Sequence, residues 1–192
     1  MNLKHLIIRD IKHPRYILSA LLVKFSHLIK NDEWYVKTRY RLYVGEKLDL
    51  ENPQKYNEKL CWQKLFDHNP LYTVMVDKYA AKDYVGNIIG YQYIIPTIGV
   101  WNNPNEIDWD NLPNQFVLKT THDSGGVIVV KDKSKLNKDK AISKLNRCLR
   151  MDNYAITREW PYKNVPRRII AETYMEDSKT HELRDYKFFC FD

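Results

Sequence analysis

The feature that most constrains the fold lies in residues 116–131, where two apolar runs flank a polar, glycine-containing stretch. Residues 116–118 and 127–130 are rich in β-branched and aromatic side chains, which favour extended backbone. Between them lie small and polar residues that include Gly125-Gly126, a pair that is free to take positive φ. We therefore expect a β-hairpin with a long polar loop.

A loop of this kind can present several backbone N–H groups to one anion, because no side chain blocks close approach. Lys119 ends the first strand and Lys131 ends the second, so both can supply positive charge to phosphate oxygens. The same pattern also describes an ordinary β-meander hairpin whose lysines are simply solvated. The hairpin alone does not decide between a phosphate-binding loop and a structural one.

The charge of the chain narrows the classes of partner. Its 192 residues carry 31 Lys and Arg against 24 Asp and Glu, a net charge of +7. The excess is concentrated in residues 1–50 and 131–150, where it either faces solvent on helices or attracts anionic partners such as nucleotides, acidic polymers, nucleic acid or the inner membrane face. The hydrophobic fraction of 44% indicates a packed globular protein, not a disordered one.

Cysteine usage and hydropathy bear on location. Cys61, Cys148 and Cys190 are far apart and odd in number, which indicates a reducing compartment. The six histidines show no metal-ligand spacing. The most apolar run, residues 17–25, is interrupted by Lys24 and is too short to span a bilayer, and no signal-peptide cleavage pattern follows it. We predict a cytoplasmic protein, with the inner face of the membrane as a further possibility.

Residues 1–30 are expected to form one or two amphipathic helices broken at Pro14. In the second helix the apolar residues fall on one face, namely Ile17, Leu18, Leu21, Leu22, Phe25, Leu28 and Ile29. This face either docks on the protein body, which is the commoner outcome, or makes a peripheral membrane contact through residues 15–30.

Residues 34–41 interleave aromatic and basic side chains. Such a mixture can stack on bases and hold phosphates, but it equally describes a helix with tyrosines packed inward and arginines outward. We favour the helix. The chain has no recognisable nucleic-acid motif, so we predict no specific nucleic-acid partner.

Periodicity and turn residues predict the remaining elements. Asn69 is expected to cap a helix that has Pro70 at its first position and that ends at Gly90. The full set is helices at 56–66, 70–89 and 138–150, short strands at 93–95, 168–174 and 185–191, and an acidic loop at 101–112.

Several blocks of the chain carry a family resemblance. The order VDKY (76–79), IP (95–96), FVLK (116–119) and IAE (170–172), followed by Glu182, resembles the ATP-grasp fold. A closer similarity to the TupA-like ATP-grasp proteins, which are associated with teichuronopeptide, capsule and other bacterial surface polysaccharides, covers the chain from about residue 31. It rests on NPQKYNEKL (52–60), NQFVLK (114–119), HDSG (122–125), REWPY (158–162) and DYKFF (185–189).

The resemblance implies an α+β fold and a division of the chain. An amphipathic helical segment (1–30) and a helical region (31–90) would pack on a partial ATP-grasp nucleotide-binding domain (91–192), which has an antiparallel sheet with covering helices. In such enzymes the Mg²⁺ ligands lie on later strands, so they are expected downstream of residue 192. We therefore expect the C-terminal part of the fold to be missing and this chain alone to be catalytically incompetent or nearly so.

The resemblance also implies a reaction and a site. ATP would phosphorylate a carboxylate of a uronic sugar or of glutamate, and an amine would displace the phosphate. No catalytic residue and no metal ligand is assigned within the chain. The residues implied at the nucleotide are Lys119 on the phosphates, the loop His122, Asp123, Ser124, Gly125 and Gly126 over the β- and γ-phosphates, Glu172 near the adenine and Glu182 on the ribose, with Asp185 and Lys187 as weaker candidates lining the cleft.

Plainer roles exist for several of these residues. Glu172 can be a solvated strand end, Glu182 can pair with Arg184 at the surface, and His122 suits a hydrogen-bonded turn better than a catalytic base.

Two other functions also fit parts of the chain. One is a glycosyltransferase of the same pathway, for which Asp108-Trp109-Asp110 has the spelling of a metal-binding DxD pair but lacks a preceding strand. The other is a basic nucleic-acid-binding module.

Overall fold

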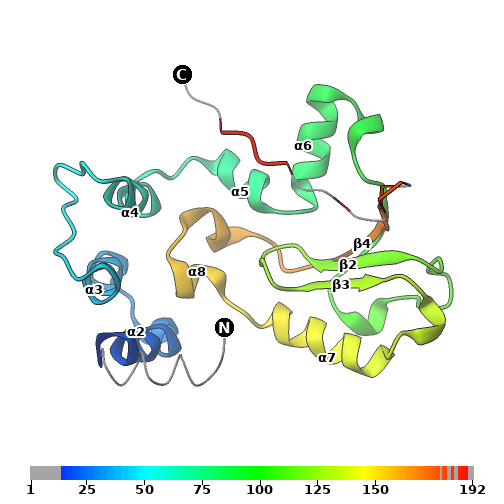
Figure 1. The fold of residues 1–192 in the computed structure, drawn as a ribbon, viewed down its shortest axis with the longest axis horizontal. Helices are drawn as coiled ribbons and strands as arrows, with labels where there is room; N and C mark the ends of the chain where they lie inside the picture. The colour runs from blue at the N-terminus through cyan, green and yellow to red at the C-terminus, as the bar shows by residue number, and fades with distance from the viewer. Residues whose placement is uncertain (1–13, 178, 181–182, 184–185, 190–192) are drawn as a thin grey trace. The chain divides into compact units, whose positions relative to one another are not determined.

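A computed structural model describes residues 14–177, 179–180, 183 and 186–189 (Figure 1). The chain forms two compact units, each assembled from two separated stretches. Unit 1 contains the described residues up to Tyr84 together with Arg150–Pro166, and unit 2 contains Val85–Leu149 and the described residues from Arg167 onward. The predicted domain at 91–192 includes residues 150–166, whereas in the structure these residues contact the N-terminal helices.

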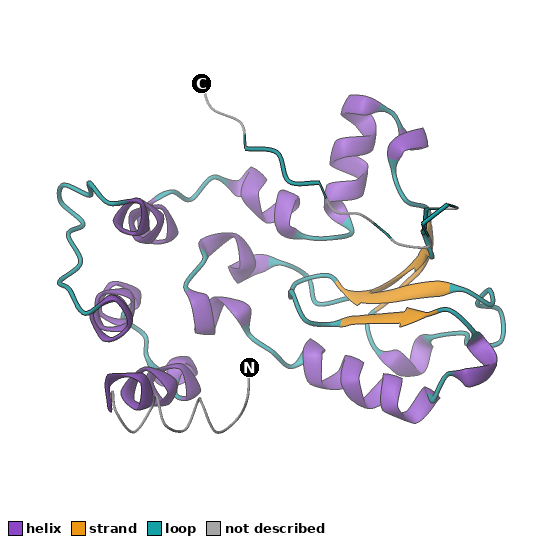
Figure 2. Cartoon of the chain, in the orientation of Figure 1, coloured by secondary structure: helices purple, strands orange, loops and turns teal. Residues whose placement is uncertain are grey.

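Unit 1 is helical in its described residues, and the four strands of the described chain belong to unit 2 (Figure 2). The helices and helical turns of unit 1 are α2 (Pro14–Lys24), η1 (Ser26–Leu28), α3 (Asp32–Val44), α4 (Tyr56–Phe66), α5 (Pro70–Val76), the first half of α6 (Ala80–Ile89), α8 (Asn153–Thr157) and η5 (Trp160–Asn164). No helix in the described part of the chain is both long and apolar enough to cross a bilayer.

Polar side chains and glycines set the helix ends. The Asn31 carboxamide accepts a hydrogen bond from the Trp34 backbone N–H at 2.8 Å, which satisfies a free donor in the first turn of α3. The helix ends at Gly45, whose φ of +90° lies in the left-handed region that suits glycine. Asn69 caps α5 in the same way, with Pro70 at the first helical position, so the predicted start of that helix is confirmed.

The helix predicted from Pro70 to residue 89 is wrong in one respect, because it breaks in two. The α5 helix ends at Val76, and a new helix, α6, begins at Ala80. Asp77 lies between them with only 2% of its surface exposed, and its carboxylate accepts the Tyr79 backbone N–H at 2.9 Å. An aspartate in this position competes with continued helical hydrogen bonding and starts a new helix instead. Gly90, with φ of +102°, ends α6 as predicted.

The core of unit 1 forms around the inward face of α3. Tyr35 and Tyr40 are buried at 0% and 5% exposure, and they pack with Val36 and Leu48. The prediction that the aromatic-basic stretch is a helix with inward tyrosines is therefore confirmed. Partly buried residues complete this cluster: Leu22, Ile29, Leu50, Cys61 and Leu65.

A buried arginine fastens residues 150–166 to this core. Arg158 follows α8 with φ of +56°, and its guanidinium lies 4.4 Å from the centre of the Tyr35 ring. It donates to the carbonyl oxygens of Ser26 at 2.9 Å and Ile29 at 2.6 Å. Its Nε lies 2.7 Å from the carboxylate of Asp32. Because its charge is paired, hydrogen-bonded and stacked, the Arg158 side chain can be buried at 3% exposure.

The apolar face predicted for residues 17–29 is only partly buried. Leu22 and Ile29 pack against the core of unit 1, whereas the larger part of the face is exposed: Ile17, Leu18, Leu21, Phe25 and Leu28. The two buried polar residues of this segment, Ser19 and Ser26, lie off the predicted stripe. Peripheral membrane contact through residues 15–30 stays a prediction.

Unit 2 is built on a four-stranded antiparallel sheet of order β1-β4-β2-β3. Its strands are β1 (Thr97–Trp101), β2 (Phe116–Thr120), β3 (Val127–Val130) and β4 (Ile169–Thr173). Its helical parts are the second half of α6 and α7 (Lys138–Leu149), with short turns η2 (Tyr91–Tyr93), η3 (Pro104–Glu106) and η4 (Lys133–Lys135). Mixed helices with a small antiparallel sheet agree with the expected fold class.

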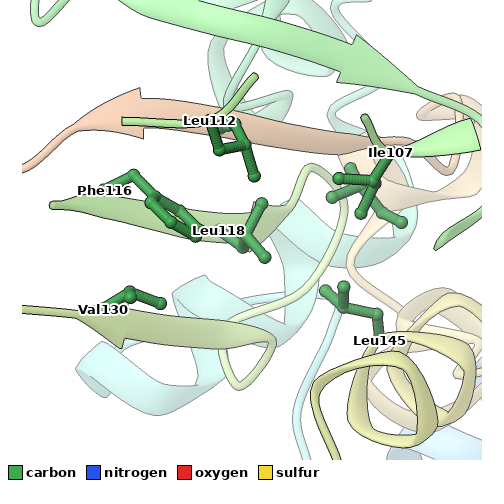
Figure 3. Packing of buried hydrophobic residues seen from close by; sticks show 8 residues of the cluster. Ile107, Leu112, Phe116, Leu118, Val130 and Leu145 are labelled. Carbon is green, nitrogen blue, oxygen red and sulfur yellow. The ribbon is translucent and has the colours of Figure 1, made fainter. Parts of the chain in front are cut away.

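One face of this sheet carries the core of unit 2 (Figure 3). Phe116 and Leu118 on β2 and Val130 on β3 point into it, and Leu145 of α7 packs against them. The remaining buried members are Ile107, Leu112, Ile169 and Ala171. Since alternate residues of a strand face opposite sides, residues 117 and 119 of β2 lie on the other face of the sheet.

Two predicted strands differ from the structure. The strand expected at 93–95 is wrong, because the chain makes the turn η2 there and pairs only from Thr97 onward. Pro96 separates the two; it has no N–H to donate, and its carbonyl accepts the Thr173 N–H at 3.1 Å. Of the strand expected at 185–191, residues 186–189 are described and form no strand, and the others lie outside the described residues.

Candidate functional site

The sheet places Lys119 and Glu172 close together on the face opposite the core. In β2, residues 116, 118 and 120 are buried against the core, so Lys119 lies on the other side. The antiparallel register pairs Lys119 with Ile170 and Val117 with Glu172. The two charged residues are therefore diagonal neighbours on adjacent strands, within reach of one another.

Lys119 and Glu172 form an ion pair through the lysine Nζ and the glutamate Oε2. The Glu172 side chain is 6% exposed and that of Lys119 is 28% exposed. A carboxylate at this depth favours a cation beside it, because burying an unpaired charge is costly. The ammonium group thus lies between a buried carboxylate and solvent, where an incoming phosphate oxygen could contact it.

The loop between β2 and β3 is braced from within by Asp123. This carboxylate is 3% exposed, and it accepts hydrogen bonds from the Thr120 hydroxyl and, at 3.1 Å, from the Gly126 backbone N–H. The bonds span the base of the loop and fix its path. In this structure Asp123 therefore holds the loop in shape.

The two glycines of the loop differ in the space around them. Neither lies in the left-handed region, so the expected use of positive φ is wrong for this pair. A Cβ atom on Gly126 would lie 1.8 Å from the Thr120 hydroxyl oxygen, so no side chain fits there. A Cβ on Gly125 would meet nothing within 4 Å. Gly126 is required for close packing, and Gly125 leaves an open surface.

Thr121 ties the loop to the start of β4. Its backbone N–H donates to the Arg168 carbonyl at 2.9 Å, and its hydroxyl accepts the Arg168 N–H at 3.0 Å. His122 follows and is 2% exposed, whereas Ser124 and Gly125 are exposed at the tip. Ser124 and Gly125 are thus the accessible part of the loop, whereas His122 is enclosed.

Of the remaining predicted nucleotide contacts, Lys187 is the one that the structure describes. Lys187 is exposed and lies in no regular element, and Glu182 and Asp185 lie outside the described residues. Lys131, at the end of β3, turns to a later segment, where its Nζ lies 5.4 Å from the centre of the Tyr174 ring and 3.7 Å from the carboxylate of Glu176. The candidate site in the described chain therefore consists of the Lys119–Glu172 ion pair and the loop that follows β2.

Two residues of α7 support the hairpin and were not identified from the sequence. The Lys144 ammonium donates to the Val127 carbonyl at 2.7 Å. Burial raises the pKa of the Cys148 thiol, and so does the Asp123 carboxylate to which the thiol is hydrogen-bonded. The helical spacing from Ala141 and Leu145 places Cys148 on the buried side, but only the fold reveals that Asp123 lies opposite.

The DxD spelling at 108–110 forms a turn and not a carboxylate pair at a strand end. Asp108 accepts hydrogen bonds from the backbone N–H and the side chain of Asn111, and these bonds lower the pKa of its carboxyl. Asp110 is highly exposed and lies 3.4 Å from the Lys138 ammonium. No group of three or more His, Cys, Asp and Glu side chains in the described chain is arranged to hold a metal ion.

Comparison with known proteins places the chain in a family. A family model described as "TupA-like ATPgrasp" matches residues 58–192, which is more than half of the chain and includes the hairpin, α7 and β4. No match was found among curated proteins or among solved structures. The matched region carries the paired Lys119 and Glu172 and the braced loop on an antiparallel sheet. The chain belongs to the TupA-like ATP-grasp family.

Proposed function

We propose that this chain provides the nucleotide-binding part of an ATP-dependent carboxylate–amine ligase that acts in bacterial surface-polysaccharide synthesis. The observation that carries the proposal is the ion pair of Lys119 and Glu172 beside the braced hairpin loop, within the region that matches the ATP-grasp family. An ammonium next to a loop with an exposed, unobstructed tip is an arrangement that suits phosphate oxygens.

In this proposal each described group has a physical task. Lys119 contacts the phosphates and is held in direction by Glu172. The exposed Ser124 and Gly125 offer hydrogen-bond donors, and the buried Asp123 keeps the loop in a fixed shape before the ligand arrives. Pre-organised donors of this kind stabilise developing charge without reorganisation. ATP would supply the phosphoryl group that activates the carboxylate.

The proposed substrates follow from the same reaction. The carboxylate is that of a uronic sugar or of glutamate, and an amine displaces the phosphate to give an amide. ATP-grasp enzymes generally use Mg²⁺, and in the described residues no group of three or more His, Cys, Asp and Glu side chains is arranged to hold one.

Calorimetric titration of the folded chain with ATP and Mg²⁺ tests the nucleotide site. We expect saturable binding by the wild type, weakened at least tenfold in Lys119→Ala, because a cation–phosphate contact in a partly buried site contributes about 1.5–3 kcal/mol. Lys140→Ala is the matched control, since it removes an exposed lysine from α7 and leaves the hairpin unchanged.

Loss of Lys119 also leaves the Glu172 carboxylate without this cation, so Lys119→Ala/Glu172→Gln is titrated beside it. Circular dichroism shows whether each variant is folded. Equal ATP affinity in the wild type and in a folded Lys119 variant would contradict the proposal. So would a folded wild type that does not bind ATP at all.

The two alternative functions gain no support from the described geometry. The carboxylates of Asp108 and Asp110 are engaged in a turn and a surface ion pair, which does not favour a metal-dependent glycosyltransferase. The aromatic-basic stretch at 34–41 uses Tyr35 and Tyr40 as core residues, which removes them from stacking on bases.

A further inference from the structure

A pocket of ≈ 510 Å³ in unit 1 has no role in the proposed nucleotide site. Residues from α4, α5 and η5 form its wall, so it lies wholly within the helical unit. This volume suits a ligand the size of a monosaccharide or an amino acid. Glu159, Pro161 and Tyr162, which belong to one of the blocks that resemble the family, contribute one side of it.

The polar groups of this pocket carry an excess of negative charge. Its ionisable lining residues are Asp67, Glu159 and Lys64. The Lys64 ammonium lies 3.4 Å from the Glu159 carboxylate, so these two charges balance one another. Asp67 accepts the Tyr72 hydroxyl at 3.1 Å and forms no ion pair with another described residue. The pocket is therefore complementary to a cation.

The rest of the lining is aromatic and apolar. Tyr72 and Tyr162 present rings with polar tips, and Leu60, Met75 and Pro161 present apolar surface. Rings of this kind pack against the C–H faces of a sugar and also attract an ammonium group. Gln63 adds an amide that can both donate to and accept from hydroxyl groups.

We propose that this pocket binds the primary amine of a compact, hydroxylated molecule such as an amino sugar, with the ammonium group directed to Asp67 and Glu159. An anionic ligand would meet two carboxylates and one already paired lysine, which disfavours it. The further assignment of this molecule as the amine acceptor of the ligase rests on the proposed function. The binding itself does not, because it depends only on residues of unit 1.

The test uses three sugars of similar size and different charge: D-glucosamine, N-acetyl-D-glucosamine and D-glucuronate. Calorimetry and NMR chemical-shift titration of the full chain measure their affinities. We expect glucosamine to bind most tightly, roughly three- to tenfold better than the acetylated sugar, since acetylation removes one charge contact. Glucuronate is expected to bind most weakly of the three.

Variants of the pocket give effects of opposite sign. Asp67→Asn and Glu159→Gln should weaken glucosamine binding about three- to tenfold, because each removes a negative charge without changing shape. Lys64→Gln should tighten it, because it frees Glu159 from its competing cation. Asp139→Asn, which removes an exposed carboxylate on α7, is the matched control and should have no effect. Damage to folding cannot produce both signs.

The amine site and the nucleotide site are separated by measuring both ligands on both sets of variants. Lys119→Ala should lower ATP affinity and leave glucosamine binding unchanged, and Asp67→Asn should do the reverse. Glucosamine affinity that equals or falls below that of N-acetyl-D-glucosamine or glucuronate would overturn the proposal. So would no binding of any of the three sugars, or an unchanged affinity in the folded Asp67→Asn variant.

Discussion

At the scale of single residues, the hairpin loop contains two adjacent glycines with opposite tolerance for a side chain. Gly126 packs so close to Thr120 that an added Cβ would overlap the hydroxyl oxygen at 1.8 Å. Gly125 faces open space. The difference has nothing to do with φ, since neither glycine occupies the left-handed region.

Alanine substitution separates these two positions. Gly126→Ala should lower the free energy of unfolding by about 1–3 kcal/mol, the usual cost of overpacking. Gly125→Ala should change it by less than about 1 kcal/mol, and a small gain is expected because alanine restricts the unfolded chain. Urea denaturation of both variants measures the difference. Equal effects at the two positions would show that the loop is not packed as described.

The hairpin and its polar loop were predictable from the sequence, but the contacts of the individual loop residues were not. Lys119 stood out because it ends an apolar strand beside a glycine loop, and the structure places it on the expected hairpin. Its pairing with Glu172 depends on the register of strands that lie about fifty residues apart, which local patterns do not encode. Asp123 looked like a ligand contact, yet its carboxylate is turned inward to Thr120 and Gly126.

At the scale of elements, the break between α5 and α6 shows how one capping residue overrides a helical pattern. The apolar spacing continues through residues 70–89, so the sequence favoured one helix. Asp77 divides it because its buried carboxylate satisfies free N–H groups at the start of α6. The signal was present as an aspartate followed by a helical run, but it was weaker than the periodicity.

Asp77→Ala should therefore destabilise the chain by about 1 kcal/mol through the loss of this cap, and Asp77→Asn should retain most of the stability. Asp83→Ala, an exposed carboxylate within α6, is the control and should change stability by less than about 0.5 kcal/mol. Thermal denaturation followed by circular dichroism provides the measurement. If Asp77→Asn lost as much stability as Asp77→Ala, the residue would not act as a cap.

At the scale of the whole molecule, the assignment of residues 150–166 to unit 1 depends on contacts that no local pattern predicts. The hydrogen bonds of Arg158 to Ser26 and Ile29 join positions that are 132 and 129 residues apart. The Tyr35 hydroxyl likewise donates to the Ile156 carbonyl at 2.7 Å, across 121 residues. Most of the individual helices and strands were predictable from the sequence, whereas the grouping of residues 150–166 with the N-terminal helices was not.

Replacement of Arg158 tests this grouping. Arg158→Met should destabilise unit 1 by about 3 kcal/mol, because the Ser26 and Ile29 carbonyl oxygens lose this donor and the Asp32 carboxylate loses its cation. Hydrogen exchange should then show faster exchange in α3 and α8. Exchange in β2 and α7 should be unchanged, because the contacts of Arg158 lie in unit 1. Unchanged protection of α3 in the variant would contradict the role assigned to this side chain.

The interleaving of the two units has a consequence for how the chain folds as it is synthesised. Because β4 lies between β1 and β2 in the sheet, β1 has no partner strand until residues 169–173 have left the ribosome. Unit 1 is likewise incomplete until residues 150–166 have been synthesised. At about 5–20 residues per second, the nascent chain spends several seconds with β1 and the face of α3 uncovered. Neither unit can finish early, so both become complete within the same short stretch of translation.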